Sequence, residues 1–201
     1  MPQVAVKQAW FEKQAPEMAK LWNDFLDSVY ETGTLDRKSK ELIAAAASTV
    51  GRCTHCTKGH IKKAQEFGAT KEEISEALMI TALISSGTEI HWMLDDYEDL
   101  LGNGSSDRWF VENTENMGQE WKTFHDALQE DSALDGKTKE LVAVAVAEMR
   151  RCRHCTIAHI KGAQEKGASK NEISEAIMVA ALIASGTQLA WMKEDYEELL
   201  G

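Results

Sequence analysis

The four cysteines of this 201-residue chain are its residues with the clearest capacity for chemistry, and they form two pairs. In each pair two residues separate the cysteines, and a histidine follows four positions after the second: Cys53, Cys56 and His60, then Cys152, Cys155 and His159. On a regular helix each set falls within about 60° of arc, so two thiols and an imidazole share one face. Such thiols can close a disulfide, and the imidazole can take or return a proton. The pattern indicates redox chemistry or metal binding.

The local charge favours the reactive thiolate form of these cysteines. If each pair opens a helix, its sulfurs lie near unpaired amide N–H groups and the positive end of the helix dipole. Positive side chains flank both pairs: Arg52, Arg150, Arg151 and Arg153. A thiolate is the species that attacks a peroxide or a disulfide. A second thiol beside it lets a sulfenic acid condense to a disulfide before over-oxidation.

Two interpretations without catalysis stay open. Cys53, Cys56 and His60 could supply three zinc ligands, with Glu41 or water as the fourth. A structural zinc site usually takes its second ligand pair from another knuckle, which the sequence does not contain. The cysteines could instead pack as small apolar residues. On its position alone, Glu41 would be a solvated side chain that complements the helix dipole.

The chain repeats itself at an offset of 99 residues. Residues 36–102 match residues 135–201 at about three positions in five, and the earlier part of each repeat aligns more weakly. A Gly/Ser/Asn-rich segment, 103–107, separates the copies and is typical of a linker. We therefore expect two units, 1–102 and 108–201, packed about a pseudo-two-fold axis so that each covers apolar faces of the other.

Both units have the patterns of an all-α protein, and no segment has a convincing strand pattern. Apolar residues recur at helical spacing, and Thr70-x-x-Glu73 and Ser169-x-x-Glu172 are capping boxes. In the first unit we expect helices at about 16–29, 36–50, 53–68, 70–86 and 92–101, with counterparts in the second.

Composition restricts the partners and the location. A formal net charge of -11 argues against nucleic-acid and anionic-membrane binding, because both surfaces would repel the chain. No stretch approaches the roughly 20 apolar residues of a membrane span. Residues 1–12 lack the pattern of a secretory signal. We expect a cytoplasmic protein that binds neither nucleic acid nor membrane.

A family resemblance rests on the cysteine motif together with the residues before it. Lys-Glu-Leu at 40–42, followed by Cys-Thr-His-Cys and a histidine at 53–60, resembles the active-site signature of alkyl hydroperoxidase D and its carboxymuconolactone decarboxylase-like relatives. The motif recurs at 139–141 and 152–159. The resemblance implies an all-helical enzyme that reduces alkyl hydroperoxides with electrons from a lipoamide-type or thioredoxin-like thiol donor. It implies no bound cofactor or metal.

The resemblance also implies a role for each site residue. The second cysteine of each pair is peroxidatic, the first is its resolving partner, and glutamate and histidine relay protons. The implied residues are Cys53, Cys56, His60, Glu41 and His55 in the first unit, and Cys152, Cys155, His159, Glu140 and His154 in the second. Helical periodicity nevertheless places His55 and His154 on the far side from the thiols. Because single-unit relatives form hexamers, a duplicated chain is expected to form a homo-oligomer, with a trimer favoured.

The cysteine pairs and four apolar residues bear on the alternative functions. The decarboxylase branch of the family generally lacks the cysteine pair, which argues against lactone decarboxylation. A disulfide reductase, or a redox-sensing or zinc-binding interaction protein, remains an alternative without peroxide turnover. Four apolar residues near the repeat ends are interpreted as core or interface: Trp92, Met93, Trp191 and Met192. His125 is interpreted as a surface residue, and His91, which aligns with Ala190, as having no role common to both repeats.

Overall fold

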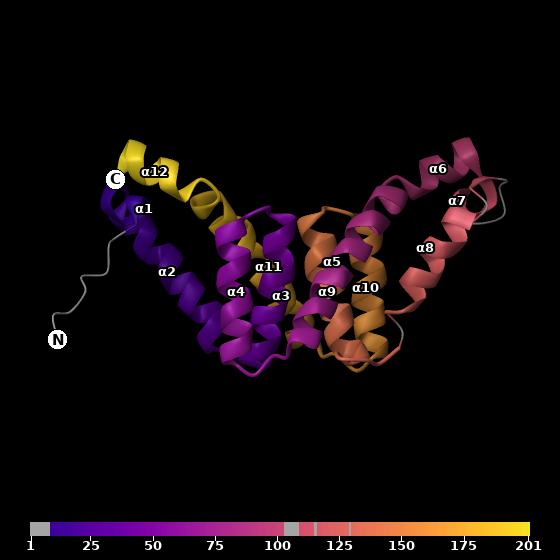
Figure 1. Cartoon of the computed structure of the whole chain (residues 1–201), viewed down its shortest axis with the longest axis horizontal. Helices are drawn as coiled ribbons and strands as arrows, with labels where there is room; N and C mark the ends of the chain where they lie inside the picture. Colours follow the sequence, from indigo (N-terminus) through magenta and orange to yellow (C-terminus); the bar gives the residue numbers. More distant parts are fainter. Residues whose placement is uncertain (1–8, 103–108, 115, 129) are drawn as a thin grey trace.

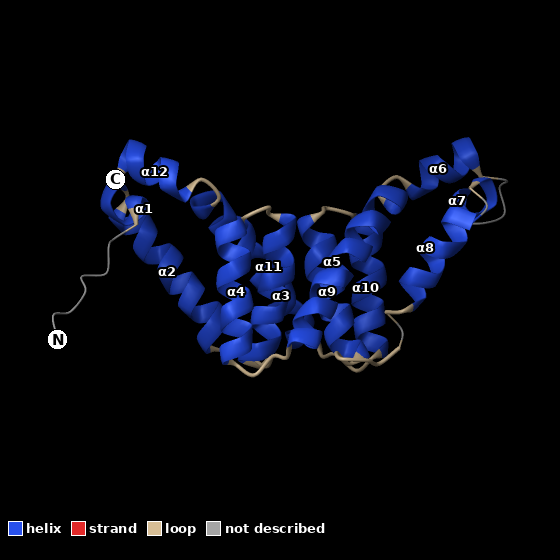
Figure 2. Ribbon diagram, in the orientation of Figure 1, coloured by secondary structure: helices blue, strands red, loops and turns tan. Residues whose placement is uncertain are grey.

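The structure of the chain is a computed structural model that describes residues 9–102, 109–114, 116–128 and 130–201. The predicted linker, residues 103–107, lies outside these ranges. The described residues are helical with no strand, so the all-α class predicted from the sequence is confirmed (Figure 2).

Twelve helices make up the described part of the chain, and they fall into a central block and two projecting arms (Figure 1). The block contains α3 (Arg37–Val50), α4 (Thr54–Glu66), α5 (Lys71–His91), α9 (Gly136–Met149), α10 (Arg153–Glu165) and α11 (Lys170–Ala190). One arm contains α1 (Trp10–Gln14), α2 (Pro16–Glu31) and α12 (Lys193–Leu200). The other contains α6 (Leu94–Leu101), α7 (Trp109–Asn113) and α8 (Asn116–Asp126). The two halves are related by a pseudo-two-fold axis.

The repeats exchange their last two helices. Helix α11 of the second repeat packs against α2, α3 and α4 of the first, and α5 packs against α9 and α10. Helix α12 pairs with α1, where the backbone N–H of Trp10 donates to Glu197 at 3.0 Å. The equivalent donation in the other arm runs from Trp109 to Glu98, also at 3.0 Å. Each half of the molecule is therefore built from both repeats.

The core runs along the two alanine-rich helices α3 and α9, which pack against each other at the centre. Residues 42–47 and 142–147 are inaccessible to solvent or nearly so. Small side chains on both helices allow this close approach, and each fully buried Leu or Ile among them stabilises the fold by about 1.5–3 kcal/mol. This pair of helices is the rigid base on which the cysteine helices lie.

The helix starts follow from local sequence signals. The side chain of Asp36 caps α3 by accepting the backbone N–H of Ser39 at 2.7 Å. Both predicted capping boxes are present, at the starts of α5 and α11. Pro16 lies in the first turn of α2, where its missing N–H leaves no hydrogen bond unmade.

One predicted boundary was wrong. We expected the helix that begins near residue 70 to end around Gly87, but α5 continues to His91. Gly87 instead allows a close approach, since a Cβ there would lie 3.1 Å from Cζ2 of Trp121. Trp92 and Met93 consequently lie in the link between α5 and α6, and not in the last helix of the repeat.

A buried lysine fastens the second repeat to the first. Lys40 is 2% exposed, donates to the carbonyl of Thr32 and lies 3.5 Å from Glu175 of α11. Glu175 also accepts the backbone N–H groups of Thr34 (2.6 Å) and Leu35 (2.9 Å). Although burial raises the pKa of Glu175, these hydrogen bonds and Lys40 hold it below its ordinary value. The contact fixes the exchanged helix in place.

By length and composition alone, one described helix, α11, could cross a membrane, so the expectation that no segment approaches that length needs correction. About two fifths of its apolar window (39%) is buried in the fold, and the helix packs against α2, α3, α4 and α9. Core helices of water-exposed proteins meet the same criterion, so this feature is weak evidence for a membrane segment.

Candidate active site

A tight turn places the first cysteine centre at the start of α4. After α3 ends, Arg52 adopts a left-handed φ of 54° and donates its N–H to the carbonyl of Thr49 at 3.1 Å. The N–H of Cys53 donates to the carbonyl of Ser48 at 3.2 Å. This pair of bonds is a Schellman motif, in which glycine is the usual left-handed residue. Arg151 forms the same turn in the second repeat, with a φ of 57°.

Both cysteine pairs form disulfides in this structure. Cys53 is the N-cap of α4, and its Sγ accepts the backbone N–H of Cys56 at 3.2 Å. Cys152 caps α10 in the same way, with Cys155 as its partner. The Cα atoms are 5.3 Å apart in each pair. When a pair is reduced, the positive end of the helix dipole favours the thiolate form of both cysteines, and this N–H adds a hydrogen bond to the first sulfur.

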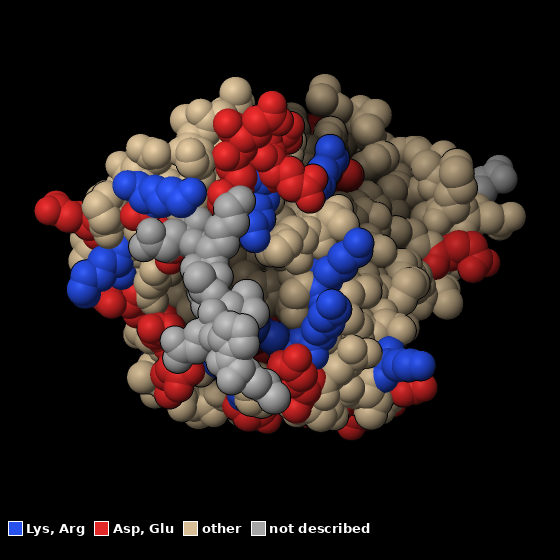
Figure 3. Space-filling model, turned by 60° about the vertical axis from the view of Figure 1, so that its left-hand side comes forward, with Lys and Arg blue, Asp and Glu red and all other residues tan. Residues whose placement is uncertain are grey.

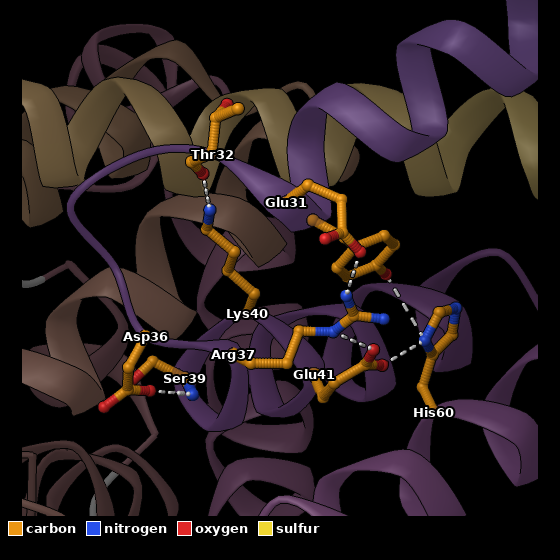
Figure 4. Close-up of polar contacts among 9 residues, drawn as sticks. Glu31, Thr32, Asp36, Arg37, Ser39, Lys40, Glu41 and His60 are labelled. Atoms are coloured by element: carbon orange, nitrogen blue, oxygen red, sulfur yellow. Dashed lines mark hydrogen bonds and ion pairs between the residues drawn. The ribbon is translucent and has the colours of Figure 1, made fainter.

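Glu41 is the buried centre of a polar network that includes His60 of the first cysteine motif (Figure 4). It is inaccessible to solvent; one carboxylate oxygen lies 2.7 Å from Nδ1 of His60, and the other accepts Nε–H of Arg37 at 2.9 Å. The hydroxyl of Tyr30 lies 3.4 Å from the same Nδ1. Burial raises the pKa of Tyr30, Glu41 raises it further and Arg37 opposes the rise, so Tyr30 remains a neutral phenol. Burial is a property of Glu41 that its position in the sequence did not indicate.

The second cysteine of the first centre faces a cavity of about 280 Å³. Three helices form its wall: α2, α4 and the exchanged α11. The lining side chains are mostly apolar: Trp22, Leu26, Tyr30, His55, Cys56, Gly59, His60, Lys63, Leu182, Ile183, Gly186, Thr187 and Ala190. His55 is among them, so it lines the same cavity as Cys56, although a regular helix would place it on the far side from the thiols. Cys53, by contrast, is 1% exposed.

The second centre keeps the glutamate–histidine pair but changes its surroundings. Nδ1 of His159 lies 2.8 Å from Glu140. The position of Arg37 is occupied by Gly136, and a Cβ there would lie only 3.0 Å from the side chain of Lys166. The first repeat therefore has a cation, Arg37, at the start of α3, whereas the second has a cation, Lys166, at the end of α10. The residue aligned with Tyr30 is Gln129, which lies outside the described part of the chain.

The second centre also gathers more histidines than the sequence suggested. His125 stacks on Trp121 (ring centroids 5.3 Å apart) and lies 6.5 Å from His159, so it is not a simple surface residue. Burial, and then the neighbouring His159, lower the pKa of His125. His91 lies 5.8 Å from His154. Neither His91 nor His125 aligns with a histidine in the other repeat, since their counterparts are Ala190 and Leu26, and this asymmetry was the only signal available.

Two further hollows flank the cysteine helices on the side of the repeat ends. One contains Trp92, Met93 and His154, and the other contains Trp191, Met192 and His55, each with acidic residues at its rim. Trp92 and Trp191 are 58% and 57% exposed, so they are not core residues of the single chain, and their interpretation as interface residues stays a prediction. Within the described ranges, no group of three His, Cys, Asp or Glu side chains is arranged to hold a metal ion.

Fold and site together define a duplicated, all-helical protein with a disulfide at a helix start and a buried glutamate–histidine pair in each half. The chain belongs to the Carboxymuconolactone decarboxylase family, whose sequence profile matches residues 16–95 and again residues 115–194. The resemblance seen in the sequence motif is thus confirmed for both repeats.

Curated relatives match over short stretches. "Uncharacterized protein 4 in cox locus" of Paracoccus denitrificans is 48% identical over 60 residues, which are 30% of this chain and 54% of that protein. "Alkyl hydroperoxide reductase AhpD" of Corynebacterium kroppenstedtii is 44% identical over 50 residues, and that of Mycobacteroides abscessus is 37% identical over 51. Each of these two stretches covers 25% of this chain and 29% of the relative. The matches therefore span about half or less of the relatives' length.

A solved structure agrees with the whole fold. A crystal structure from Burkholderia xenovorans LB400, provisionally named as a gamma-carboxymuconolactone decarboxylase subunit, superposes with a TM-score of 0.72. The superposition covers 96% of this chain and 90% of that one, at 19% sequence identity. At that identity the agreement supports the fold and carries no information on the reaction.

Proposed function

We propose that the chain is a thiol-dependent peroxidase that reduces organic hydroperoxides through a dithiol/disulfide cycle. The observation that carries the proposal is the position of Cys56: it faces a mostly apolar cavity beside His60, which contacts the buried Glu41. Kinship with proteins named alkyl hydroperoxide reductase supports the same chemistry. The cysteine pairs favour it over lactone decarboxylation.

The reaction requires a reduced cysteine pair. The Cys56 thiolate attacks the terminal oxygen of the hydroperoxide, the O–O bond breaks, and the alcohol leaves after it takes a proton. Cys56 is then a sulfenic acid. The thiol of Cys53 attacks its sulfur, forms the disulfide seen here and releases water. Two electrons from a donor dithiol reduce that disulfide, and the donor leaves as its own disulfide.

The different burial of the two sulfurs supports different roles for them. Cys56 lines the cavity, whereas Cys53 is buried, so Cys56 is the sulfur that a hydroperoxide can reach. Glu41 contacts Nδ1 of His60, which orients the ring and leaves Nε2 as the nitrogen that exchanges a proton. The buried carboxylate stabilises the imidazolium between proton uptake and proton delivery. No bound cofactor is needed.

The electron donor is proposed to be a small lipoamide-type dithiol or a thioredoxin-like protein. The chain has a formal net charge of -11, so it would repel an acidic donor protein over long range. Figure 3 shows the face that presents the first arm, where acidic side chains form clusters and Lys and Arg side chains lie between them. A small dithiol that enters the cavity avoids this repulsion.

A homo-oligomer, with a trimer favoured, is proposed for the assembled protein. The arms expose large apolar side chains that the single chain does not cover, among them Met18 (70% exposed), Leu21 (63%) and Met117 (74%). Apolar side chains exposed together on a projecting element are typical of an interface. Light scattering of the purified chain measures the assembly directly.

A turnover assay tests the proposed function. Hydroperoxide consumption is measured with dihydrolipoamide or dithiothreitol as donor, for the wild type and for the double variant Cys56→Ser/Cys155→Ser. The proposal expects steady consumption that falls at least 100-fold in the variant. Oxidation of the thiols without turnover would support a redox sensor instead. Reduction of a protein disulfide without peroxide consumption would support a disulfide reductase, and zinc in stoichiometric amount would support the metal interpretation.

A further inference from the structure

The two cysteine centres differ most where a substrate would approach the second sulfur. In the first centre that approach is an open cavity, to which the exchanged helix α11 contributes Ala190 and helix α4 contributes Gly59. At the second centre, His91 of helix α5 takes the place of Ala190, and Ala158 of helix α10 takes the place of Gly59. Both changes add atoms at the mouth of the second centre.

His91 fills the space that Ala190 leaves open. Its ring lies 5.5 Å from Trp121, 5.8 Å from Phe110 and 5.8 Å from His154, measured between ring centroids. It is therefore packed in an aromatic cluster over α10. The methyl group of Ala190, at the aligned position, is too short to fill the same space, and it lines the open cavity that Cys56 faces.

His125 adds a further ring beside the second centre, from helix α8. It occupies the position of Leu26, stacks on Trp121 and faces His159. The exposed fractions agree with these added rings: Cys155 is buried at 5% and His159 at 8%, whereas Cys56 and His60 are both half-buried. The sulfur that a hydroperoxide must reach is less accessible in the second centre.

We propose that residues 190 and 91, each supplied to a centre by the opposite repeat, determine the size of hydroperoxide that the centre accepts. The first centre, with Ala190, takes bulky organic hydroperoxides. The second, with His91, is restricted to hydrogen peroxide and other small oxidants. The inference rests on the proposed peroxidase function. Loss or gain of a few apolar contacts in a pocket changes selectivity between substrates by about 10- to 200-fold. One imidazole at the mouth is therefore enough to give the two centres different selectivity for hydroperoxide size.

Single-centre proteins make the comparison possible. Cys152→Ser/Cys155→Ser leaves the first centre, and Cys53→Ser/Cys56→Ser leaves the second. In each, kcat/KM is measured for cumene hydroperoxide and for hydrogen peroxide with a dithiol donor, and the ratio of the two values is compared. We expect the ratio to be at least 10-fold higher for the first centre. Equal ratios in the two proteins would overturn the inference.

Reciprocal exchange of the two residues tests the cause. Ala190→His in the first-centre protein is expected to lower the cumene-to-hydrogen-peroxide ratio about 10-fold, and His91→Ala in the second-centre protein is expected to raise it. His125→Leu, which restores the residue of the first centre, provides a second opening variant if His91→Ala folds poorly. Ratios that do not move in any exchange variant would show that neither residue determines size.

Thiol labelling distinguishes a failure of this inference from a failure of the proposed function. The reduced proteins are treated with iodoacetamide or with the bulky N-(1-pyrenyl)maleimide, and each cysteine is quantified by peptide mass spectrometry. We expect Cys56 to react with both reagents, Cys155 to react with the small one only, and His91→Ala to open Cys155 to the bulky one. This result supports the size difference even if no peroxide is consumed. Equal labelling of both cysteines by the bulky reagent contradicts it whatever the reaction is.

Discussion

Arg37 donates its Nε–H to the buried carboxylate of Glu41 at 2.9 Å, and the two residues lie one helical turn apart on α3. The guanidinium also lies 4.1 Å over the ring of Tyr30 and 3.7 Å from Glu31. Glu41 is isolated from solvent, and Arg37 supplies a positive charge that balances its carboxylate from the edge of the site. A buried charge without such a partner is strongly unfavourable.

Replacement of Arg37 is the most direct test of this arrangement. Arg37→Gly, which introduces the residue of the second repeat, is expected to lower the free energy of unfolding by about 2 kcal/mol, because Glu41 loses a charged donor. Adding Phe67→Lys should recover part of the loss, since Lys166 stands at the aligned position beside Gly136. Urea denaturation measures both. If the single variant is as stable as the wild type, Arg37 has no such role.

The sequence predicted much of this site, and the reason is local spacing. The cysteines, His60 and Glu41 occur at fixed intervals on adjacent helices, so a linear motif specifies them. Tyr30 could not be predicted in the same way, because it reaches His60 from a helix of the arm. His60 is 30 residues away from Tyr30 in the chain, and no periodic pattern links the two.

The exchange of helices explains what else the sequence missed. The repeat at an offset of 99 predicted two similar units, but the repeat alone does not say which copy of a helix covers which centre. Ala190 and His91 therefore looked unrelated to the centres they line, and His125 looked like surface. In contrast, the capping boxes and the alanine-rich core helices depend only on neighbouring residues and were predicted correctly.

The buried lysine between the repeats is expected to matter for stability more than for the reaction. Lys40→Met removes the donation to Thr32 and leaves Glu175 without its cation, so the free energy of unfolding should fall by about 2–3 kcal/mol. Lys139, which lies 3.1 Å from Glu76 in the matching contact, provides the equivalent variant. Thermal and urea unfolding check both. A Lys40→Met protein with unchanged stability would show that the contact between repeats contributes little.

The left-handed arginine before each cysteine pair predicts a stabilising substitution. A non-glycine residue in this conformation is disfavoured by roughly 1–2 kcal/mol, so Arg52→Gly should raise the free energy of unfolding by about 1 kcal/mol, reduced by the greater freedom of glycine in the unfolded chain. Arg52→Ala is the matched control, because it removes the charge but keeps the strain. Chemical denaturation should therefore rank glycine above both arginine and alanine. Equal stability of the glycine and alanine variants would contradict the strain.

Arg151→Gly repeats the test in the second centre and separates strain from charge. If the positive side chain also favours the thiolate, the glycine and alanine variants should lose reactivity to the same extent despite their different stabilities. Reaction of the reduced protein with iodoacetamide as a function of pH measures this. A loss confined to one of the two variants would point to geometry and not to charge.

Glu172 predicts how stability depends on pH. Its carboxylate accepts Lys137 at 2.8 Å and the N–H of Ser169 at 2.7 Å, and the Lys137 hydrogen bond is the main cause that lowers its pKa to about 2. Because the pKa in the folded protein is below the ordinary value of 4.5, the stabilisation is complete above pH 4.5 and disappears as the pH falls towards 2. Glu172→Gln should therefore cost about 1 kcal/mol at pH 7, as loss of a helix cap does. The difference from wild type should vanish near pH 2.

Urea denaturation at a series of pH values measures this difference in stability. Glu73→Gln is the matched variant, because Glu73 is the aligned cap and pairs with Lys38. A difference that stays constant from pH 7 to pH 2 would mean that the charge of Glu172 does not stabilise the fold.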